Sequence, residues 1–341
     1  MKSKVIIIAE AGVNHNGDFG LAYKLIDAAA SAGADYVKFQ TFNADKLVTR
    51  TASKADYQTA NTNDADSSQY EMLKKLQMPK EWHRSLQKYS IEKGISFLST
   101  GFDEESIDFL DTLGIPFFKI PSGEISNKPF IEHIARKGKP VILSTGMADM
   151  DEIRAAVTII MGQGLDRDMI TILHCNTEYP TPMLDVNLLA MNAIKKEFGV
   201  RVGYSDHTLG IEVPVAAVAL GAEIIEKHFT LDKSMSGPDH KASLDPIELK
   251  AMVNAIRNIE QAISGNAVKE ASPSEIKNKL IARKSIYTKR ALEAGHVISL
   301  NDLEMKRPGN GISPMEIDSI IGKKLIVSQP KEHMLSYKDV E

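Results

Sequence analysis

Short apolar runs alternate with segments of helical spacing along the first 263 residues. The apolar runs carry β-branched and aromatic residues, as strands buried on both faces do. They occupy 5–9, 35–40, 95–99, 116–121, 140–144, 170–175, 201–206 and 223–230. Helical spacing follows at 21–32, 70–75 with 79–93, 104–113, 128–136, 150–161, 186–198, 209–222 and 246–263.

Eight strand–helix repeats predict a (β/α)8 TIM barrel over residues 1–263. A doubly wound open sheet is the competing α/β fold. It would spread the strand ends along a crevice, and no GxGxxG turn follows the first strand here. The pattern therefore favours the barrel.

The chain after residue 263 changes character. Residues 264–275 are rich in Ser, Pro, Gly and charge and are predicted to be a linker. Residues 276–341 contain short β-prone pieces, a turn-like RPGNGI and one short helical segment at 314–321, which indicates a small, mostly β module. Within the barrel, a polar insert spans 41–68, and its acidic part at 61–68 is expected to be a solvated loop placed to cover the barrel mouth.

Polar residues gather at the C-terminal ends of the predicted strands. In a barrel these ends converge on one mouth, where active sites lie. The residues placed there are Glu10, Lys38, Gln40, Thr100, Lys119, Ser122, Glu124, Ser144, Ser205, His207 and His228.

Two of these residues are histidines at the ends of successive strands. A helical segment separates them, so they belong to one βαβ unit and should share a face. Two imidazoles on one face can hold a divalent metal, although each could be a core histidine bonded to backbone. Glu226 and Lys227, beside His228, could form an ion pair, and Cys175 is expected to be a small buried residue. His83, in a helical context, is expected to be solvated.

Composition and charge narrow the class of protein. The net charge of −4 provides no basic field for nucleic acid or an anionic membrane. A single cysteine allows no disulfide within the chain, and the first apolar run is too short for a signal peptide. No run approaches the ~20 apolar residues that span a bilayer. These features predict a cytoplasmic protein.

The predicted mouth suits an anionic substrate and a polarised carbonyl. Lysines with hydroxyls and backbone N–H groups bind phosphate or carboxylate. A two-histidine metal site leaves positions for water and a substrate oxygen. The residues alone therefore predict a metal-dependent barrel acting on a phosphorylated small molecule, with carbon–carbon bond formation as the suggested chemistry.

The motifs resemble those of the sialic acid synthase family over nearly the whole chain. They are EAGVNHNGD, VKFQTF, FKIPSGE, LSTGM, HCNTEYPTP, GYSDHT, EKHFTLDKSMSGPDH and KRPGNGIS. The resemblance implies a barrel followed by an antifreeze-like (SAF) domain, in a domain-swapped homodimer. It implies condensation of phosphoenolpyruvate with N-acetylmannosamine or a related N-acylated amino sugar, with a divalent metal, Mn²⁺ or Mg²⁺ or Co²⁺.

The resemblance also assigns roles by motif. His207 and His228 would be metal ligands, and Glu10 and Glu124 would handle protons and water. The phosphate of phosphoenolpyruvate would be held by Lys38, Thr100, Lys119 and Ser122, and its carboxylate side by Ser144 and Ser205. The sugar would be contacted by Gln40, Tyr179, Asp239 and Arg307. Some members read CTNxYP where this chain reads CNTEYP, so Asn176 or Thr177 would contact substrate.

Three functions follow from these observations. The first is N-acetylneuraminate synthesis. The second is the same chemistry on 2,4-diacetamido-2,4,6-trideoxymannose, giving N,N'-diacetyllegionaminate, because EAGVNHNGD and GPDHKASL resemble that branch equally. The third, from a different class, is a non-catalytic carbohydrate- or ice-binding protein built on the C-terminal module. The mouth lysines, carboxylates and histidines argue against the third.

Overall fold

A computed structural model describes residues 4–62 and 68–341. It divides into two compact units, Met1–Gly265 and Asn266–Glu341. Residues 63–67, which make up most of the loop predicted to cover the mouth, lie outside the described residues.

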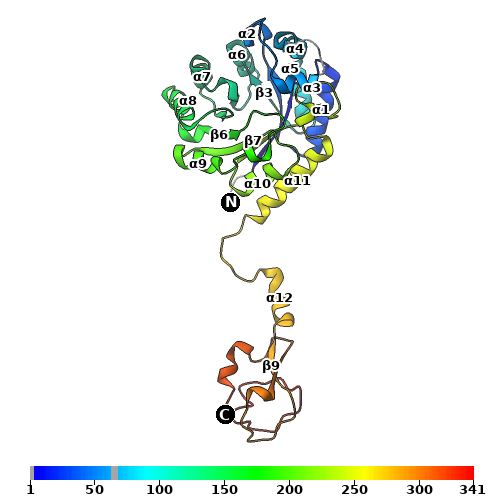
Figure 1. The fold of residues 1–341 in the computed structure, drawn as a ribbon, viewed down its shortest axis with the longest axis vertical. Coiled ribbons are helices and arrows are strands. Elements are labelled where there is room, and N and C mark those ends of the chain that lie inside the picture. Colours follow the sequence, from blue (N-terminus) through cyan, green and yellow to red (C-terminus); the bar gives the residue numbers. More distant parts are fainter. Residues whose placement is uncertain (1–3, 63–67) are drawn as a thin grey trace. The chain divides into compact units, whose positions relative to one another are not determined.

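The first unit contains eight parallel strands that close into a near-barrel (Figure 1). Hydrogen bonds join them in the order β3-β2-β1-β8-β7-β6-β5-β4, and β3 lies next to β4. This arrangement confirms the barrel and excludes the open sheet. The strands are β1 (Ile6–Gly12), β2 (Tyr36–Thr41), β3 (Ser96–Gly101), β4 (Phe118–Ile120), β5 (Val141–Ser144), β6 (Ile170–Cys175), β7 (Arg201–Asp206) and β8 (Ile224–His228).

Helices surround the strands and bury one apolar stripe each against them (Figure 1). Local sequence sets their ends. Asp18 accepts the backbone N–H of Leu21 at the start of α1, and Asp149 and Asp245 form capping boxes. The helices are α1 (Phe19–Ala32), α5 (Lys80–Glu92), α6 (Glu104–Thr112), α7 (Lys128–Ala135), α8 (Met150–Gly162), α9 (Ala190–Phe198), α10 (Glu212–Ala219) and α11 (Pro246–Ala262).

The polar insert after β2 forms three short helices above the mouth. They are α2 (Ala44–Leu47), α3 (Asp56–Thr62) and α4 (Gln69–Leu76). Their apolar residues pack with Val13 and Phe102, from the loops after β1 and β3, in a cluster separate from the barrel core. In α3, the Asn61 side chain donates to the carbonyl of Pro238 at 2.8 Å, which ties the insert to the loop after β8.

The second unit has its own small core and mostly irregular β structure. Antiparallel strands β9 (Ser285–Thr288) and β10 (Leu303–Lys306) form its sheet, and isolated bridges such as Leu325 with Val340 extend the pairing. Ile286, Leu335 and other buried aliphatic residues form its core. The predicted helical segment is a 3-10 helix at Pro314–Ser319. A helix that the sequence analysis missed, α12 (Pro273–Ala282), begins within the predicted linker.

Asp302 is the buried anion of this unit and should control its acid stability. Its carboxylate accepts from Arg290, His296 and Ser299. Burial alone would raise the pKa of Asp302, but these hydrogen bonds hold it well below its usual range. The unfolded state therefore binds more protons below about pH 4, so the stabilisation is present above that pH and is lost as the pH falls.

We expect Asp302→Asn to destabilise the second unit by about 2 kcal/mol at pH 7, because charged acceptors of buried hydrogen bonds are lost. Hydrogen exchange of amides in 284–341, measured by mass spectrometry, reports this unit alone. Asp318→Asn, an exposed control, should leave the exchange unchanged. Equal protection in both variants would show that the Asp302 charge contributes nothing.

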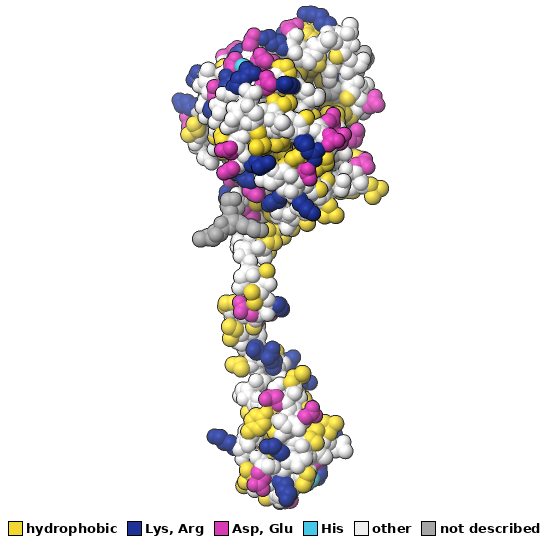
Figure 2. Space-filling model, turned by 90° about the vertical axis from the view of Figure 1, so that its left-hand side faces the viewer, with side chains coloured by type: hydrophobic (Ala, Val, Ile, Leu, Met, Phe, Trp, Pro, Cys, Tyr) yellow, Lys and Arg dark blue, Asp and Glu magenta, His cyan; other side chains and the backbone are white. Residues whose placement is uncertain are grey.

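The visible face of the first unit carries charges of both signs without a one-sign field (Figure 2). Over 4–62 and 68–341, no helix combines the length and the apolar character that crossing a bilayer requires.

Candidate active site

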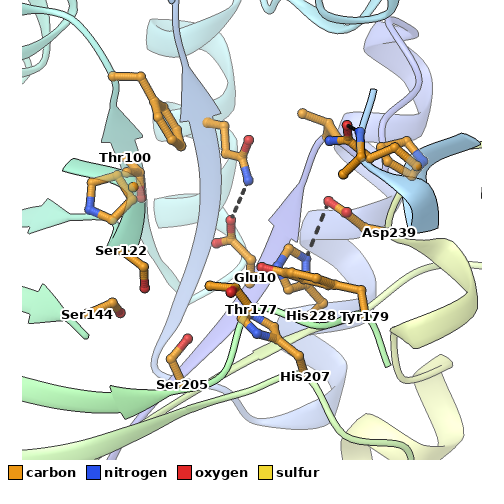
Figure 3. Close-up of a pocket in the computed structure, with 18 of the residues that line it drawn as sticks. Glu10, Thr100, Ser122, Ser144, Thr177, Tyr179, Ser205, His207, His228 and Asp239 are labelled. Carbon is orange, nitrogen blue, oxygen red and sulfur yellow. Dashed lines mark hydrogen bonds and ion pairs between the residues drawn. The ribbon is translucent and has the colours of Figure 1, made fainter. Parts of the chain in front are cut away.

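Strand register brings the predicted polar residues to one level of the barrel. Glu10 on β1 is paired in register with Lys38 on β2 and with His228 on β8, and Gln40 is paired with Thr100 on β3. They line a cavity of about 520 Å³, within the usual range of small-molecule sites (Figure 3). Of the sixteen predicted site residues, all except Asn176 and Arg307 line it.

The floor of the cavity is a row of alternating buried charges. Lys38 Nζ lies 2.8 Å from Glu10 and 3.6 Å from Glu226, and Lys119 Nζ lies 2.9 Å from Glu226. All four side chains are almost fully buried. Thr100 accepts from Lys38 at 2.7 Å, so the lysine is held from two sides. Two cations fixed side by side can bind an anionic substrate group that reaches the floor.

The two floor carboxyls have opposite protonation behaviour. Burial raises the pKa of Glu10 to about 7, and this effect outweighs the attraction of Lys38. Burial also tends to raise the pKa of Glu226, but Lys119 and Lys38 hold it at about 2. Glu226 is thus a permanent anion between two cations, whereas Glu10 can exchange a proton near neutral pH.

Hydroxyl groups line the side of the cavity formed by β4, β5 and β7. The backbone N–H of Gly146 donates to Ser122 Oγ at 2.9 Å. Ser205 donates to Glu226 at 3.3 Å. Ser144 Oγ is buried and has no hydrogen-bond partner among the described residues. A buried hydroxyl without a partner is costly, so Ser144 is placed to bond a ligand.

His207 and His228 lie together at the ends of the neighbouring strands β7 and β8, with ring centroids 5.5 Å apart (Figure 3). His207 Nδ1 donates to the carbonyl of Asn176, which leaves the lone pair on Nε2. His228 Nδ1 is buried, has no hydrogen bond among the described residues, and lies 3.8 Å from Asp239. Burial, followed by repulsion from His207, lowers the pKa of His228 well below its usual value.

This pair fits a divalent ion because imidazoles whose orientation is fixed are metal ligands. Among the described residues, no group of three or more His, Cys, Asp or Glu side chains has an arrangement suited to a metal. Any ion held here would therefore take its remaining ligands from water and substrate. The alternative was that each residue is a core histidine bonded to the backbone. That alternative gives no reason for two adjacent imidazoles to line one cavity.

Tyr179 forms an aromatic wall above the histidines. Its ring lies 4.0 Å from that of His207 and 4.9 Å from that of Tyr57, which comes from α3. Asp239 lines the same side, and burial raises its pKa to about 6 despite the opposing effect of His207. The stack gives the cavity a flat face with a carboxyl group beside it.

Gly12 allows the close approach of His228 to β1. Its φ is +53°, and a Cβ at this position would lie 3.1 Å from His228 Cε1. Behind the histidines, the buried Lys227 ammonium pairs with Asp206 and donates to the Thr208 carbonyl at 2.7 Å. This pair holds the chain on both sides of His207.

Four predicted residues need separate description. Asn176 Oδ1 accepts from the backbone of Glu178 at 2.8 Å, whereas Thr177 lines the cavity. Of the two residues, only Thr177 therefore lines the cavity. Glu124 lines the cavity and accepts from Asn127 at 2.6 Å. Arg307 follows β10 in the second unit, is exposed, and has no side-chain partner in the part of the chain that is described.

One alternative that the sequence left open is excluded, and one expectation about an individual residue was wrong. Glu226 does not pair with Lys227, because alternation along β8 places Glu226 with His228 inside the barrel and Lys227 outside it. His83 is not solvated: it is fully buried and bonded to Thr41 at 2.7 Å. Tyr57 was missed, since nothing in the insert's sequence indicates that its ring meets Tyr179.

Residues 25–269 match the NeuB family, and residues 283–341 match the SAF domain. The chain belongs to the NeuB family. It is 52% identical over 320 residues to the N,N'-diacetyllegionaminic acid synthase of Campylobacter jejuni, covering 94% of this chain and 95% of the relative. It is 49% identical to the corresponding synthase of Legionella pneumophila, covering 98% and 94%.

Among solved structures, the N-acetylneuraminic acid synthetase of Leptospira borgpetersenii in complex with citrate is similar, with a TM-score of 0.71 and 35% identity. The match covers 81% of this chain and 90% of that one. The comparisons confirm the predicted barrel with a SAF domain. They also confirm an enzyme of the predicted type, a phosphoenolpyruvate-dependent synthase that forms a carbon–carbon bond.

Proposed function

We propose that this NeuB-family enzyme is an N,N'-diacetyllegionaminate synthase, which condenses phosphoenolpyruvate with 2,4-diacetamido-2,4,6-trideoxymannose and water and releases phosphate. The sequence analysis placed N-acetylneuraminate synthesis first and this acceptor second. The relatives that are 52% and 49% identical support the second acceptor. N-acetylneuraminate synthesis remains the alternative, supported by the similar solved structure.

The charged floor of the cavity is the observation that supports binding of phosphoenolpyruvate. Lys38 and Lys119 are buried and mutually bridged by Glu226, so they are positioned before substrate arrives. With Thr100 and Ser122 they would hold the phosphate of phosphoenolpyruvate, and Ser144 and Ser205 would hold its carboxylate.

The acceptor aldehyde would lie at His207 and His228. A divalent ion held by these imidazoles, Mn²⁺, Mg²⁺ or Co²⁺, would supply polarisation of the aldehyde oxygen when bound. Tyr179, Gln40 and Asp239 would orient the sugar over this point. Burial tends to lower the pKa of His207, but Cys175 and then the Asn176 carbonyl raise it, so protons should compete with the ion at low pH.

The reaction would then proceed by attack of C3 of phosphoenolpyruvate on the aldehyde carbon, whose oxygen takes a proton. C2 becomes cationic, water adds there, and the tetrahedral intermediate expels phosphate as the C2 carbonyl forms. Glu10 can accept the proton of the added water, since its pKa of about 7 suits a base near neutral pH. Glu124 at the rim is the second candidate for this role.

The proposal includes a cytoplasmic homodimer in which SAF domains are exchanged. Helix α12 buries none of its residues, and Ile276, Leu280 and Ile281 are all more than half exposed. Apolar residues exposed together on one short helix favour contact with another surface. A second copy of the chain is the partner proposed.

Phosphate release tests the function. We expect release from phosphoenolpyruvate only when the diacetamido sugar is present, at a lower rate with N-acetylmannosamine, and none after treatment with EDTA. Release that needs no sugar, or no release with any sugar and metal, would defeat the proposal. The latter result would favour the non-catalytic carbohydrate-binding alternative.

Lys119→Met tests the donor site. The variant keeps side-chain length and removes a charge that contributes about 1.5–3 kcal/mol to a hydrogen bond, so KM for phosphoenolpyruvate should rise roughly ten- to hundredfold. KM for the sugar should change much less. Lys128→Met, an exposed control, should match the parent protein. An equal rise in both KM values would show that Lys119 does not bind the donor.

A further inference from the structure

The cavity has a second end whose chemistry differs from that of its floor. Beneath the insert, its walls are apolar. They are formed by Val13, Leu47, Val48, Met72, Leu73, Leu76 and Phe102. The other insert residues that line this end are Ala55, Tyr57, Gln58 and Gln69, so no described residue that the insert contributes to the cavity is charged.

Helix α4 presents one face to the cavity. Gln69, Met72, Leu73 and Leu76 follow the i, i+3, i+4, i+7 spacing, and all four line it. Met72 and Leu76 are buried in the small apolar cluster, which supports Leu73 and Leu47 from behind. Leu73, Leu47 and Val48 are only partly buried and retain apolar surface toward the cavity. We call these three residues the apolar wall.

The polar groups beside the apolar wall are neutral, and their side-chain amide N–H groups form only long bonds, although Gln58 Oε1 also accepts from the backbone of Ala55 at 3.0 Å. Gln69 donates to Gln58 at 3.4 Å, and Gln58 donates to Tyr57 at 3.4 Å. Bonds of this length are readily exchanged for shorter ones with a ligand amide. A neutral, N-acylated group fits such an environment. A phosphate would meet no cation among the described insert residues that line the cavity, and a free hydroxymethyl group would face aliphatic carbon.

We infer that the apolar wall selects the acceptor by receiving the methyl-bearing end of the sugar, its C6 methyl and C4 acetamido groups. This inference rests on the proposed function, because it takes the aldehyde to lie at the histidine pair. The pair and the wall line the same cavity. Glu10 is paired in register with His228 and accepts from Gln40 at 3.4 Å, and Leu47 and Leu73 of the wall pack on residues from the loops after β1 to β3. An acceptor bound at both places would be oriented by a polar end and an apolar end.

The preference for a 6-deoxy sugar over its 6-hydroxy counterpart can be estimated from the effect of single methyl groups in other apolar pockets. One methyl or methylene group in an apolar pocket changes specificity by about tenfold or more. We therefore expect the protein to bind the 6-deoxy analogue of N-acetylmannosamine about tenfold more tightly than N-acetylmannosamine itself. Adding the C4 acetamido group should tighten binding again.

The experiment measures binding of these three sugars by ligand-observed NMR with phosphoenolpyruvate absent, and kcat/KM for phosphate release where turnover occurs. Leu73→Asn and the isosteric Val48→Thr alter the apolar wall, and Leu184→Asn alters a side chain that is 98% exposed. Trp82 fluorescence verifies folding. The wall variants should lose the preference for the deoxy sugars about tenfold while KM for phosphoenolpyruvate is unchanged, and the control should keep the preference.

The outcomes separate this inference from the proposed function. If the protein binds the 6-deoxy analogue no better than N-acetylmannosamine, or if both folded wall variants keep the preference, the apolar wall does not select the acceptor, whether or not turnover is seen. If the deoxy sugars bind preferentially, the wall variants lose that preference and neither sugar is turned over, the inference about the apolar wall holds and the proposed reaction is wrong. Equal loss of binding for all three sugars would assign the wall a purely structural role.

Discussion

His228→Ala is expected to lower kcat for phosphate release about a thousandfold while leaving the barrel folded. A bound divalent ion supplies several kcal/mol of charge stabilisation, and each 1.36 kcal/mol is a factor of ten in rate. A site with two protein ligands cannot lose one and keep its ion. His228 forms no side-chain hydrogen bond through Nδ1 among the described residues, so alanine leaves no new unpaired polar group behind.

Direct metal binding distinguishes this role from others. Titration with Mn²⁺, followed by electron paramagnetic resonance, should show tight binding to the parent protein and weak binding to His228→Ala and His207→Ala. His133→Ala, which removes a partly buried imidazole paired with Asp108 and outside the cavity, should bind as the parent does. Two imidazoles admit several divalent metals, so Mn²⁺ is used as the probe and not as the assigned ion. Full activity of either cavity variant in chelated buffer would refute the assignment.

The barrel and its mouth were predictable because strand periodicity fixes both. Buried parallel strands give continuous apolar runs, and an interruption such as Lys38 within a run must face a polar interior. The same periodicity should have identified Glu226, which lies two residues before His228 and hence on its face of β8. It was missed because Lys227 beside it offered a local partner, whereas the real partners, Lys38 and Lys119, come from distant strands.

Other features depended on contacts that no local pattern records. The apolar residues of the insert are sparse in sequence and become a cluster only when α4 folds over the loops after β1 and β3. His83 is buried because Thr41 and Phe109 surround it, although its helix is polar overall. Helix α12 begins at Ser272 with a capping box and a proline, signals that were outweighed by the linker-like composition around it.

Arg307→Ala should also be nearly inactive, and it should regain activity when mixed with inactive His207→Ala protein. Helix α11 begins after β8 at the mouth, and its seventeen residues descend about 25 Å along the barrel. Residues 264–272 connect it to α12 and span at most about 30 Å when fully extended. This connection and the helix after it could reach the mouth of the same subunit or that of a second copy, and we expect the second.

Subunit exchange decides between the two arrangements. If Arg307 acts on the partner's site, each mixed dimer has one site with both defects and one with neither, and random mixing restores roughly a quarter of the parent's sites. If Arg307 acts on its own subunit, every site keeps one defect. Mixing His207→Ala with Arg283→Ala, another exposed arginine of the second unit, controls for effects of exchange itself. No recovery after exchange has been verified by mass spectrometry would exclude the swapped dimer.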